Sequence, residues 1–87
     1  PVVCSIVPIG EASEKQNTLT WTPLSPLPVR LRVERDDSPA TGIPITSAEY
    51  IDRNGIVCNV RYCYLVEADL TDQTTVRSAP VCLRGLS

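Results

Sequence analysis

The chain has 87 residues and a mass of 9.5 kDa, the size of one small domain whose stability gains from covalent cross-links. It contains no histidine, the commonest general base and metal ligand, so most hydrolytic and zinc chemistry is disfavoured. Its net charge of -2 comes from interspersed acids and bases, and its apolar runs are short. Nucleic-acid binding and membrane insertion are therefore not expected.

Four cysteines are the second constraint, and neither a C-x-x-C pair nor a histidine accompanies them. An even number in so small a domain indicates disulfides and an oxidising compartment rather than a metal or redox site, and no cofactor is expected. The chain also lacks methionine. We therefore expect Pro1 to arise by processing or by excision from a longer polypeptide, with any signal peptide already removed.

The first part of the chain predicts two strands. Residues 1–9 are apolar, β-branched and interrupted by a proline, which is typical of an edge strand that bends. Residues 10–17 are polar, show no helical repeat and predict a loop. Residues 18–22 alternate again and place Leu19 and Trp21 on one face, which we expect in the core.

The middle of the chain predicts three more strands. Three prolines interrupt any ladder before residue 29, and we expect the chain to cross there from one sheet to the other. Residues 29–35 alternate most clearly, with Leu31 and Val33 facing one way and charged side chains the other. Residues 43–45 and 47–52 predict two short strands, the first at an edge because of its central proline.

The longest strand is predicted at residues 60–68, after a turn marked by Asn-Gly. Its inward positions are Tyr62, Tyr64, Val66 and Ala68. A polar loop at residues 69–73 then leads to a final strand at residues 75–83. Seven short strands without an amphipathic helix predict an all-β sandwich, with residues 1–87 as a single domain.

Five segments carry a resemblance to a known family: Leu19-Thr-Trp21-Thr-Pro23, Val33-Glu-Arg35-Asp36, Tyr50-Ile-Asp52, the alternation from Tyr62 to Ala68, and Ser78-Ala-Pro80. Together they resemble the fibronectin type III domain in its bacterial secreted form. The resemblance implies a seven-stranded immunoglobulin-like sandwich in which the Tyr62 hydroxyl bonds back to the preceding loop. It also implies a spacer or adhesion module of an extracellular protein, and no catalytic residues.

The resemblance further implies a structural disulfide between Cys63 and Cys82, since the sixth and seventh strands of this family are antiparallel neighbours. Cys4 would then pair with Cys58, which needs the N-terminal segment to be displaced from its place in the family. Two alternatives stay open: Cys4–Cys82 together with Cys58–Cys63, or Cys4 bonded to another chain.

Two candidate ligand sites compete with plainer interpretations. Asp36 and Asp37, and Asp52 with Asn54, could hold calcium through oxygen ligands. No calcium-loop spacing is present, however, and we interpret them as turn residues that cap their own backbone. Aromatic side chains could stack on sugars. The alternation, however, directs Trp21 and two tyrosines into the core and leaves only Tyr50 open to such a role.

Four charged residues are expected on the outer face of the larger sheet: Arg30, Arg32, Arg61 and Glu67. They could form a surface that binds a partner. Because exposed ion pairs contribute little to stability or affinity, we interpret them as a solvated charge ladder.

The sequence thus predicts a non-enzymatic extracellular module, either a spacer or a subunit of a bacterial cell-surface or filamentous assembly. The expected partners are flanking domains or other subunits, and unpaired backbone groups of edge strands offer a route to them and to homo-oligomers. The alternative is a polysaccharide-binding or adhesion module of a secreted protein, and an enzyme is the least favoured class.

Overall fold

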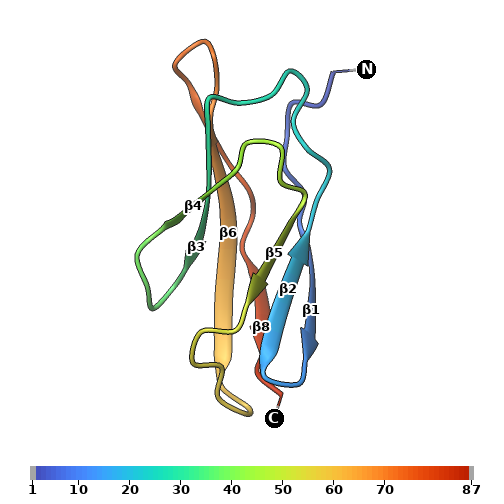
Figure 1. The fold of residues 1–87 in the computed structure, drawn as a ribbon, viewed down its shortest axis with the longest axis vertical. Coiled ribbons are helices and arrows are strands. Elements are labelled where there is room, and N and C mark those ends of the chain that lie inside the picture. The colour runs from blue at the N-terminus through green and yellow to red at the C-terminus, as the bar shows by residue number, and fades with distance from the viewer. Residues whose placement is uncertain (1, 87) are drawn as a thin grey trace.

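The computed structural model describes residues 2–86, which contain eight strands and no helix (Figure 1). The strands are β1 (Ile9–Ser13), β2 (Gln16–Thr20), β3 (Arg30–Arg35), β4 (Thr41–Ile43), β5 (Glu49–Asp52), β6 (Arg61–Asp69), β7 (Thr75–Arg77) and β8 (Val81–Arg84). One sheet has the order β1-β2-β5, and the other the order β4-β3-β6-β7, with β8 also paired to β6. The predicted all-β sandwich is confirmed. The same residues form no helix long and apolar enough to cross a membrane.

The interior is built from alternate residues of neighbouring strands. β6 buries every second side chain along its length, as the period-two pattern predicted. The structure buries the residues expected in the core, all at 7% exposure or less: Leu19, Trp21, Leu31, Val33, Tyr62, Tyr64, Val66 and Ala68. Burying one large apolar side chain contributes roughly 1.5–3 kcal/mol, so these positions account for much of the attraction between the sheets.

The first strand lies later in the chain than predicted. Residues 10–17 were expected to be a loop, but they contain most of β1, the turn after it and the start of β2. Residues 1–9 were expected to be the strand. Within residues 2–8, the structure instead records an isolated bridge from Val3 to Ser25.

β1 escapes a pattern-based prediction because its inward positions hold the small residues Gly10 and Ala12 rather than large apolar ones. A Cβ atom at Gly10 would lie 2.6 Å from Val81 of β8, so the close approach of these strands requires glycine. The turn after β1 is made by Lys15 at φ 59° rather than by the Asn-Gly pair that usually marks a hairpin.

The C-terminal strand is divided, which raises the strand count from the predicted seven to eight. β7 and β8 both pair with β6, but residues 78–80 leave the ladder between them. Ser78 is buried there, and its hydroxyl accepts a hydrogen bond from the Val66 amide at 2.9 Å. β4 is also displaced from residues 43–45, because Pro44 follows the strand instead of lying at its centre.

Gly85 closes β8 against the loop before β6, and its substitution tests this contact. A Cβ atom at Gly85 would lie 2.2 Å from the backbone oxygen of Val57, so Gly85→Ala forces the backbone to move. We expect a loss of about 2 kcal/mol in the free energy of unfolding, measured by urea denaturation. Gly42→Ala is the matched control, since nothing lies within 4 Å of that position. Equal stability of the two variants would contradict the packing described.

The molecule is elongated, with extents of 41 × 24 × 19 Å, and the chain enters and leaves at opposite ends of the long axis (Figure 1). We call the end formed by residues 2–4, 24–27 and 70–72 the N-terminal pole. The end formed by residues 57–60, Lys15 and Leu86 is the C-terminal pole, where the Lys15 amide bonds to the Leu86 oxygen at 2.8 Å. β6 runs from the C-terminal pole to the N-terminal one.

Candidate functional site

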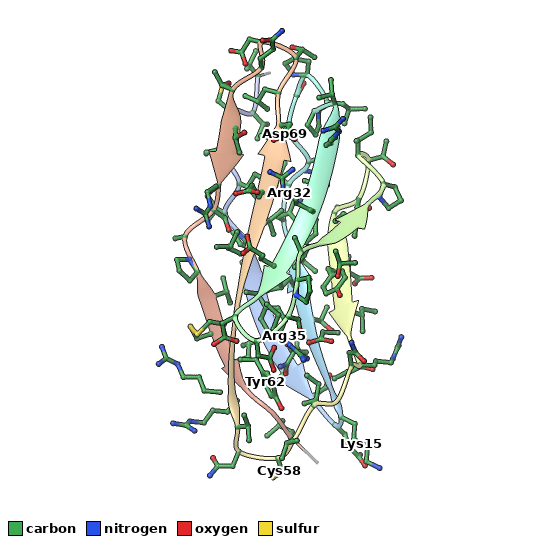
Figure 2. All side chains as sticks on the ribbon, turned by 90° about the vertical axis from the view of Figure 1, so that its left-hand side faces the viewer. Lys15, Arg32, Arg35, Cys58, Tyr62 and Asp69 are labelled. Carbon is green, nitrogen blue, oxygen red and sulfur yellow. A yellow bond between two sulfur atoms is a disulfide. The ribbon has the colours of Figure 1, made fainter. Side chains whose placement is uncertain are left out.

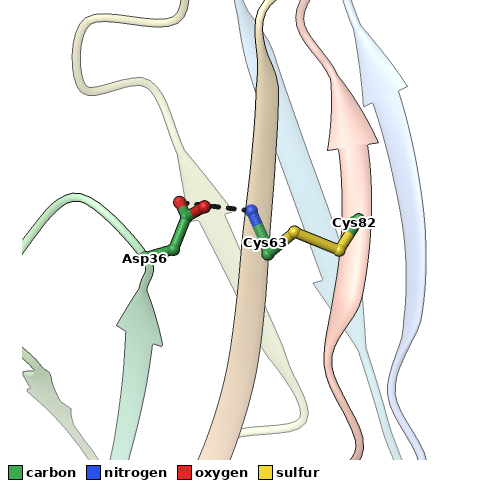
Figure 3. The surroundings of a disulfide bond; sticks show 3 residues. All are labelled: Asp36, Cys63 and Cys82. Atoms are coloured by element: carbon green, nitrogen blue, oxygen red, sulfur yellow. Dashed lines mark hydrogen bonds between the residues drawn. A yellow bond between two sulfur atoms is a disulfide. The ribbon is translucent and has the colours of Figure 1, made fainter.

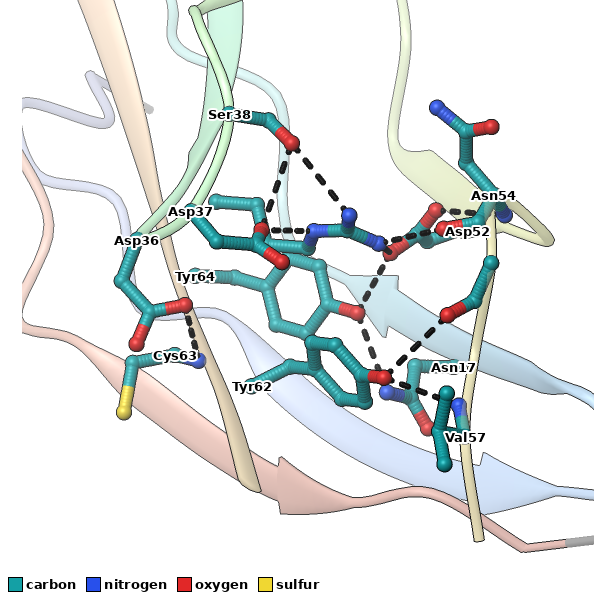
Figure 4. Close-up of polar contacts among 12 residues, drawn as sticks. Asn17, Asp36, Asp37, Ser38, Asp52, Asn54, Val57, Tyr62, Cys63 and Tyr64 are labelled. Atoms are coloured by element: carbon teal, nitrogen blue, oxygen red, sulfur yellow. Dashed lines mark hydrogen bonds and ion pairs between the residues drawn. The ribbon is translucent and has the colours of Figure 1, made fainter. Parts of the chain in front are cut away.

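The largest group of polar residues inside the sandwich joins the two sheets (Figure 4). Arg35 at the end of β3 donates to Asp52 at the end of β5 at 2.9 Å. The Tyr64 hydroxyl on β6 donates to the same carboxylate at 2.6 Å, and Asn17 on β2 donates to that hydroxyl at 3.0 Å. Asp52 and Asn17 are only 4% and 1% exposed. We call these four residues the inter-sheet cluster.

Arg35 is the hub of the cluster. Its guanidinium also pairs with Asp37, donates to the backbone oxygen of Asn54 at 2.7 Å, and lies 5.0 Å from the centre of the Tyr62 ring. Burial alone would lower the pKa of Arg35, but the hydrogen bonds to Asp37 and Asp52 outweigh it and raise that pKa. Arg35 is therefore a permanent charge that cross-links the sheets, with no role as an acid or base.

Asp52 takes part in a turn as well as in the cluster, as the plainer interpretation expected. Its second carboxylate oxygen accepts the Asn54 amide at 2.9 Å. Within residues 2–86, no group of three or more carboxylates, cysteines or histidines could hold a metal ion. The calcium interpretation of Asp36, Asp37 and Asp52 thus receives no support from the geometry.

Tyr62 forms the corner that the family resemblance implies. Its hydroxyl accepts the Val57 amide at 2.8 Å and donates to the Gly55 oxygen at 3.2 Å. Both partners belong to the loop that leads into β6. These two hydrogen bonds therefore hold the loop at the C-terminal pole against Tyr62, the first inward residue of β6.

Tyr64 gives the cluster a measurable dependence on pH. Burial and the hydrogen bond to Asp52 raise the pKa of Tyr64 above its ordinary value of about 10. The unfolded tyrosine ionises near pH 10 while the folded one stays neutral, so the contribution of Tyr64 to stability is constant below that pH and falls above it. We expect urea denaturation between pH 9 and pH 11.5 to show this fall, with a shallower slope for Tyr64→Phe. Equal slopes would contradict it.

The disulfide between Cys63 and Cys82 is present, and it joins residues that face each other in the β6–β8 register (Figure 3). Their Cα atoms are 4.0 Å apart. The Cys63 amide also donates to the Asp36 side chain at 3.3 Å, which connects the bridge to the end of β3.

Cys4 and Cys58 do not form the disulfide that was predicted for them. Both are free and exposed. Cys4 lines the hollow at the N-terminal pole, and Cys58 lies at the C-terminal pole, where Figure 2 shows it. The nine residues of β6 separate the two poles, and at roughly 3.3 Å per residue this distance is far beyond the reach of a disulfide. The prediction is wrong because the N-terminal segment is not displaced towards the loop before β6.

The predicted charge ladder is present only in part. Arg32 pairs with Glu67 and, at 3.0 Å, with Asp69, and Arg77 pairs with Glu67 at 2.9 Å. The hydrogen bond from Arg32 and a second from Thr75 lower the pKa of Asp69. Arg30 and Arg61 take no part in these pairs. The network lies on the outer face of the sheet, where Arg32, Glu67 and Asp69 are half-buried and Arg77 is exposed.

Sequence reasoning missed the inter-sheet cluster, although one signal for it existed. Arg35 has the same parity as Leu31 and Val33, so the alternation of β3 already places a charge on the inward face. A buried charge needs a partner, and Asp52 has the inward parity of β5. Asn17 could not be assigned because it was placed in a loop.

Four hollows line the described part of the chain. The smallest, about 30 Å³, lies beside Arg35 and Asp52, and an open groove of about 490 Å³ follows β3 and β4. A third, of about 210 Å³, lies at the N-terminal pole. A fourth, of about 170 Å³, lies beside Cys63 and Leu65. Two aromatic residues line these hollows, half-buried Tyr50 in the first and buried Tyr64 in the fourth, and neither exposes a ring face broad enough to serve as a platform for sugars.

Comparison with known proteins finds solved structures of the same fold. No family model matches the chain, and no curated protein does. A fibronectin type III-like protein from Clostridium thermocellum superposes with a TM-score of 0.60 and 28% identity, over 95% of this chain and 88% of that one. Pectate lyase PelI from Erwinia chrysanthemi, solved with tetragalacturonic acid, superposes with a TM-score of 0.68 and 17% identity. That match covers 91% of this chain but only 27% of the lyase, and at this identity it shows the fold alone.

The sandwich topology, the corner made by Tyr62 and the likeness to the clostridial protein agree with one another. The chain therefore has the fold of a fibronectin type III-like domain.

Proposed function

We propose that this domain is a non-catalytic extracellular module that acts as a rigid spacer in a longer polypeptide or in a bacterial cell-surface assembly. The observation that carries the proposal is the position of the chain ends. Residues 2 and 86 lie at opposite poles of a molecule 41 Å long (Figure 1), so neighbouring domains would be held apart along that axis. A module whose ends lay side by side would hold its neighbours together instead.

The chemistry of the domain supports a structural role. Buried hydrogen bonds of Asp52 with Arg35 and Tyr64 join the two sheets, although the Asn17 side-chain oxygen has no partner among the described residues. The Cys63–Cys82 disulfide suits an oxidising, extracellular setting. In the pectate lyase, the part that matches this fold makes up 27% of the chain, which fits a module within a larger protein. A polysaccharide-binding role is less favoured, because Trp21, Tyr62 and Tyr64 lie in the core.

Scattering from a tandem of two copies, joined head to tail without a linker, tests the spacer role. If each copy holds its ends apart, the maximum dimension should roughly double from that of one copy. Side-by-side packing of the two copies would leave the long dimension near 41 Å and would contradict the proposal. Single copies at the same concentration provide the control for association between molecules.

A further inference from the structure

The two free cysteines lie one at each pole, on backbone that the fold holds in place. Cys4 follows Val3, whose backbone is bonded to Ser25 in both directions at 3.1 Å. Cys58 (Figure 2) lies in a loop that is bonded twice to Gly85, at 2.8 and 2.9 Å. Both thiols are exposed, and neither can reach the other within one molecule.

The N-terminal pole has an apolar hollow beside Cys4. Its volume is about 210 Å³, and it lies between residues 2–4, residues 24–27 and the loop after β6. Leu24 and Leu70 line it, and Val2 in its wall is 71% exposed. Since a cavity of roughly 150 Å³ admits benzene, this hollow has room for an aliphatic side chain from another molecule.

The C-terminal pole presents side chains that would suit such a hollow. Val57, Val60 and Leu86 are exposed by 55%, 43% and 48%, and the two valines flank Cys58 in the sequence. Aliphatic side chains gathered in this way on a surface mark a contact site more often than isolated ones do.

The charges of the poles are also complementary. Arg61 and Arg84 face each other in the β6–β8 register, and Arg84 donates to the Asn59 oxygen in the loop of Cys58. At the other pole, Asp72 lines the hollow, and hydrogen bonds from Thr74 lower its pKa. None of these three charged groups forms an ion pair among the described residues. Each pole therefore carries charge that the other can neutralise.

We infer that the C-terminal pole of one copy docks onto the N-terminal pole of a second copy, and that a disulfide between Cys58 and Cys4 closes the contact. The inference rests on the proposed spacer function, since it extends the same end-to-end arrangement from neighbouring domains to neighbouring molecules. The two surfaces are different and lie at opposite ends, so the contact does not close on itself and generates open linear chains.

The bond forms by thiol–disulfide exchange with a small-molecule disulfide such as oxidised glutathione. The Cys4 thiolate attacks one glutathione sulfur and releases the other as a thiolate. The Cys58 thiolate of the next copy then attacks the Cys4 sulfur and displaces the second glutathione. Two protein thiols lose two protons and two electrons, and one glutathione disulfide is reduced to two thiols.

Oxidation of the 87-residue chain, with its Cys63–Cys82 bridge intact, tests the inference. Incubation with oxidised glutathione should give a ladder of dimers, trimers and longer species on a non-reducing gel. Cys4→Ser and Cys58→Ser should each remain monomeric, whereas an equimolar mixture of the two variants should give dimers and no trimers. Dimers from either variant alone, or no linked species from the unmodified chain, would overturn the inference.

The apolar part of the contact has a matched pair of variants. Val57→Asp places a charge on the docking surface and should slow the linking about tenfold, the effect of roughly 1.4 kcal/mol. Val7→Asp changes a valine that is 73% exposed but lies outside both poles, and it should leave the rate unchanged. Equal slowing by both would overturn the assignment of the poles. The two proposals fail in different ways. If the two-copy tandem is extended in scattering but oxidised glutathione does not link single copies, this inference alone is rejected. If the tandem is compact, the spacer function is rejected.

Discussion

Replacing Asp52 by asparagine is expected to lower the free energy of unfolding by about 3 kcal/mol, as measured by urea denaturation at neutral pH. The substitution keeps the shape of the side chain but removes the charge that pairs with Arg35 at 2.9 Å. Arg35 is largely enclosed, and it would be left with a single carboxylate partner, Asp37, on the surface. The Tyr64 hydroxyl would lose a charged acceptor at the same time.

Asp37→Asn is the control for this prediction. Asp37 pairs with the same guanidinium, but its side chain is 52% exposed against 4% for Asp52. An exposed ion pair contributes about 1 kcal/mol or less, so this variant should stay close to the unmodified protein. If the two variants lost the same stability, the inter-sheet cluster would not hold the sheets together in the way described.

Removing the Cys63–Cys82 disulfide by a double alanine substitution should also cost about 3 kcal/mol. The bridge spans 19 residues of sequence, and the chain-entropy model assigns this value to a loop of that size. For a domain of 87 residues, this loss is a large share of a total stability of roughly 5–10 kcal/mol. Thermal unfolding followed by circular dichroism, under non-reducing conditions, measures the effect.

The other two cysteines supply the control. Cys4→Ala together with Cys58→Ala removes two exposed thiols that have no partner in the molecule, and it should change the stability by less than about 0.5 kcal/mol. A loss as large as that of the first double variant would indicate that Cys4 and Cys58 are bonded to each other in solution.

The parts of the fold that follow a strict period could be predicted from sequence. β3 and β6 alternate cleanly between buried and more exposed positions. The sequence therefore placed Leu31 and Val33 of β3, and the four inward residues of β6 that end at Ala68, on the face that the structure buries. The family resemblance then supplied the neighbouring positions of the last two strands, and with them the Cys63–Cys82 bridge and the corner at Tyr62.

The parts that failed depend on contacts distant in sequence. β1 was missed because Gly10 packs against β8, a contact that no local pattern records. The break between β7 and β8 depends on Ser78 replacing a ladder bond at Val66. The pairing of Cys4 with Cys58 was inferred from what remained once the other two cysteines were paired, and the length of β6 excludes it.

The register of β6 is central to the account, since the core, the corner and both cysteine assignments depend on it. Peptide mapping tests it directly, because trypsin places the four cysteines in four separate peptides, cut after Lys15, Arg61, Arg77 and Arg84. The protein is alkylated without reduction, before any added oxidant, and then digested. We expect one linked pair of peptides, containing Cys63 and Cys82, and alkyl groups on Cys4 and Cys58. A link between Cys58 and Cys63, or between Cys4 and Cys82, would contradict the fold.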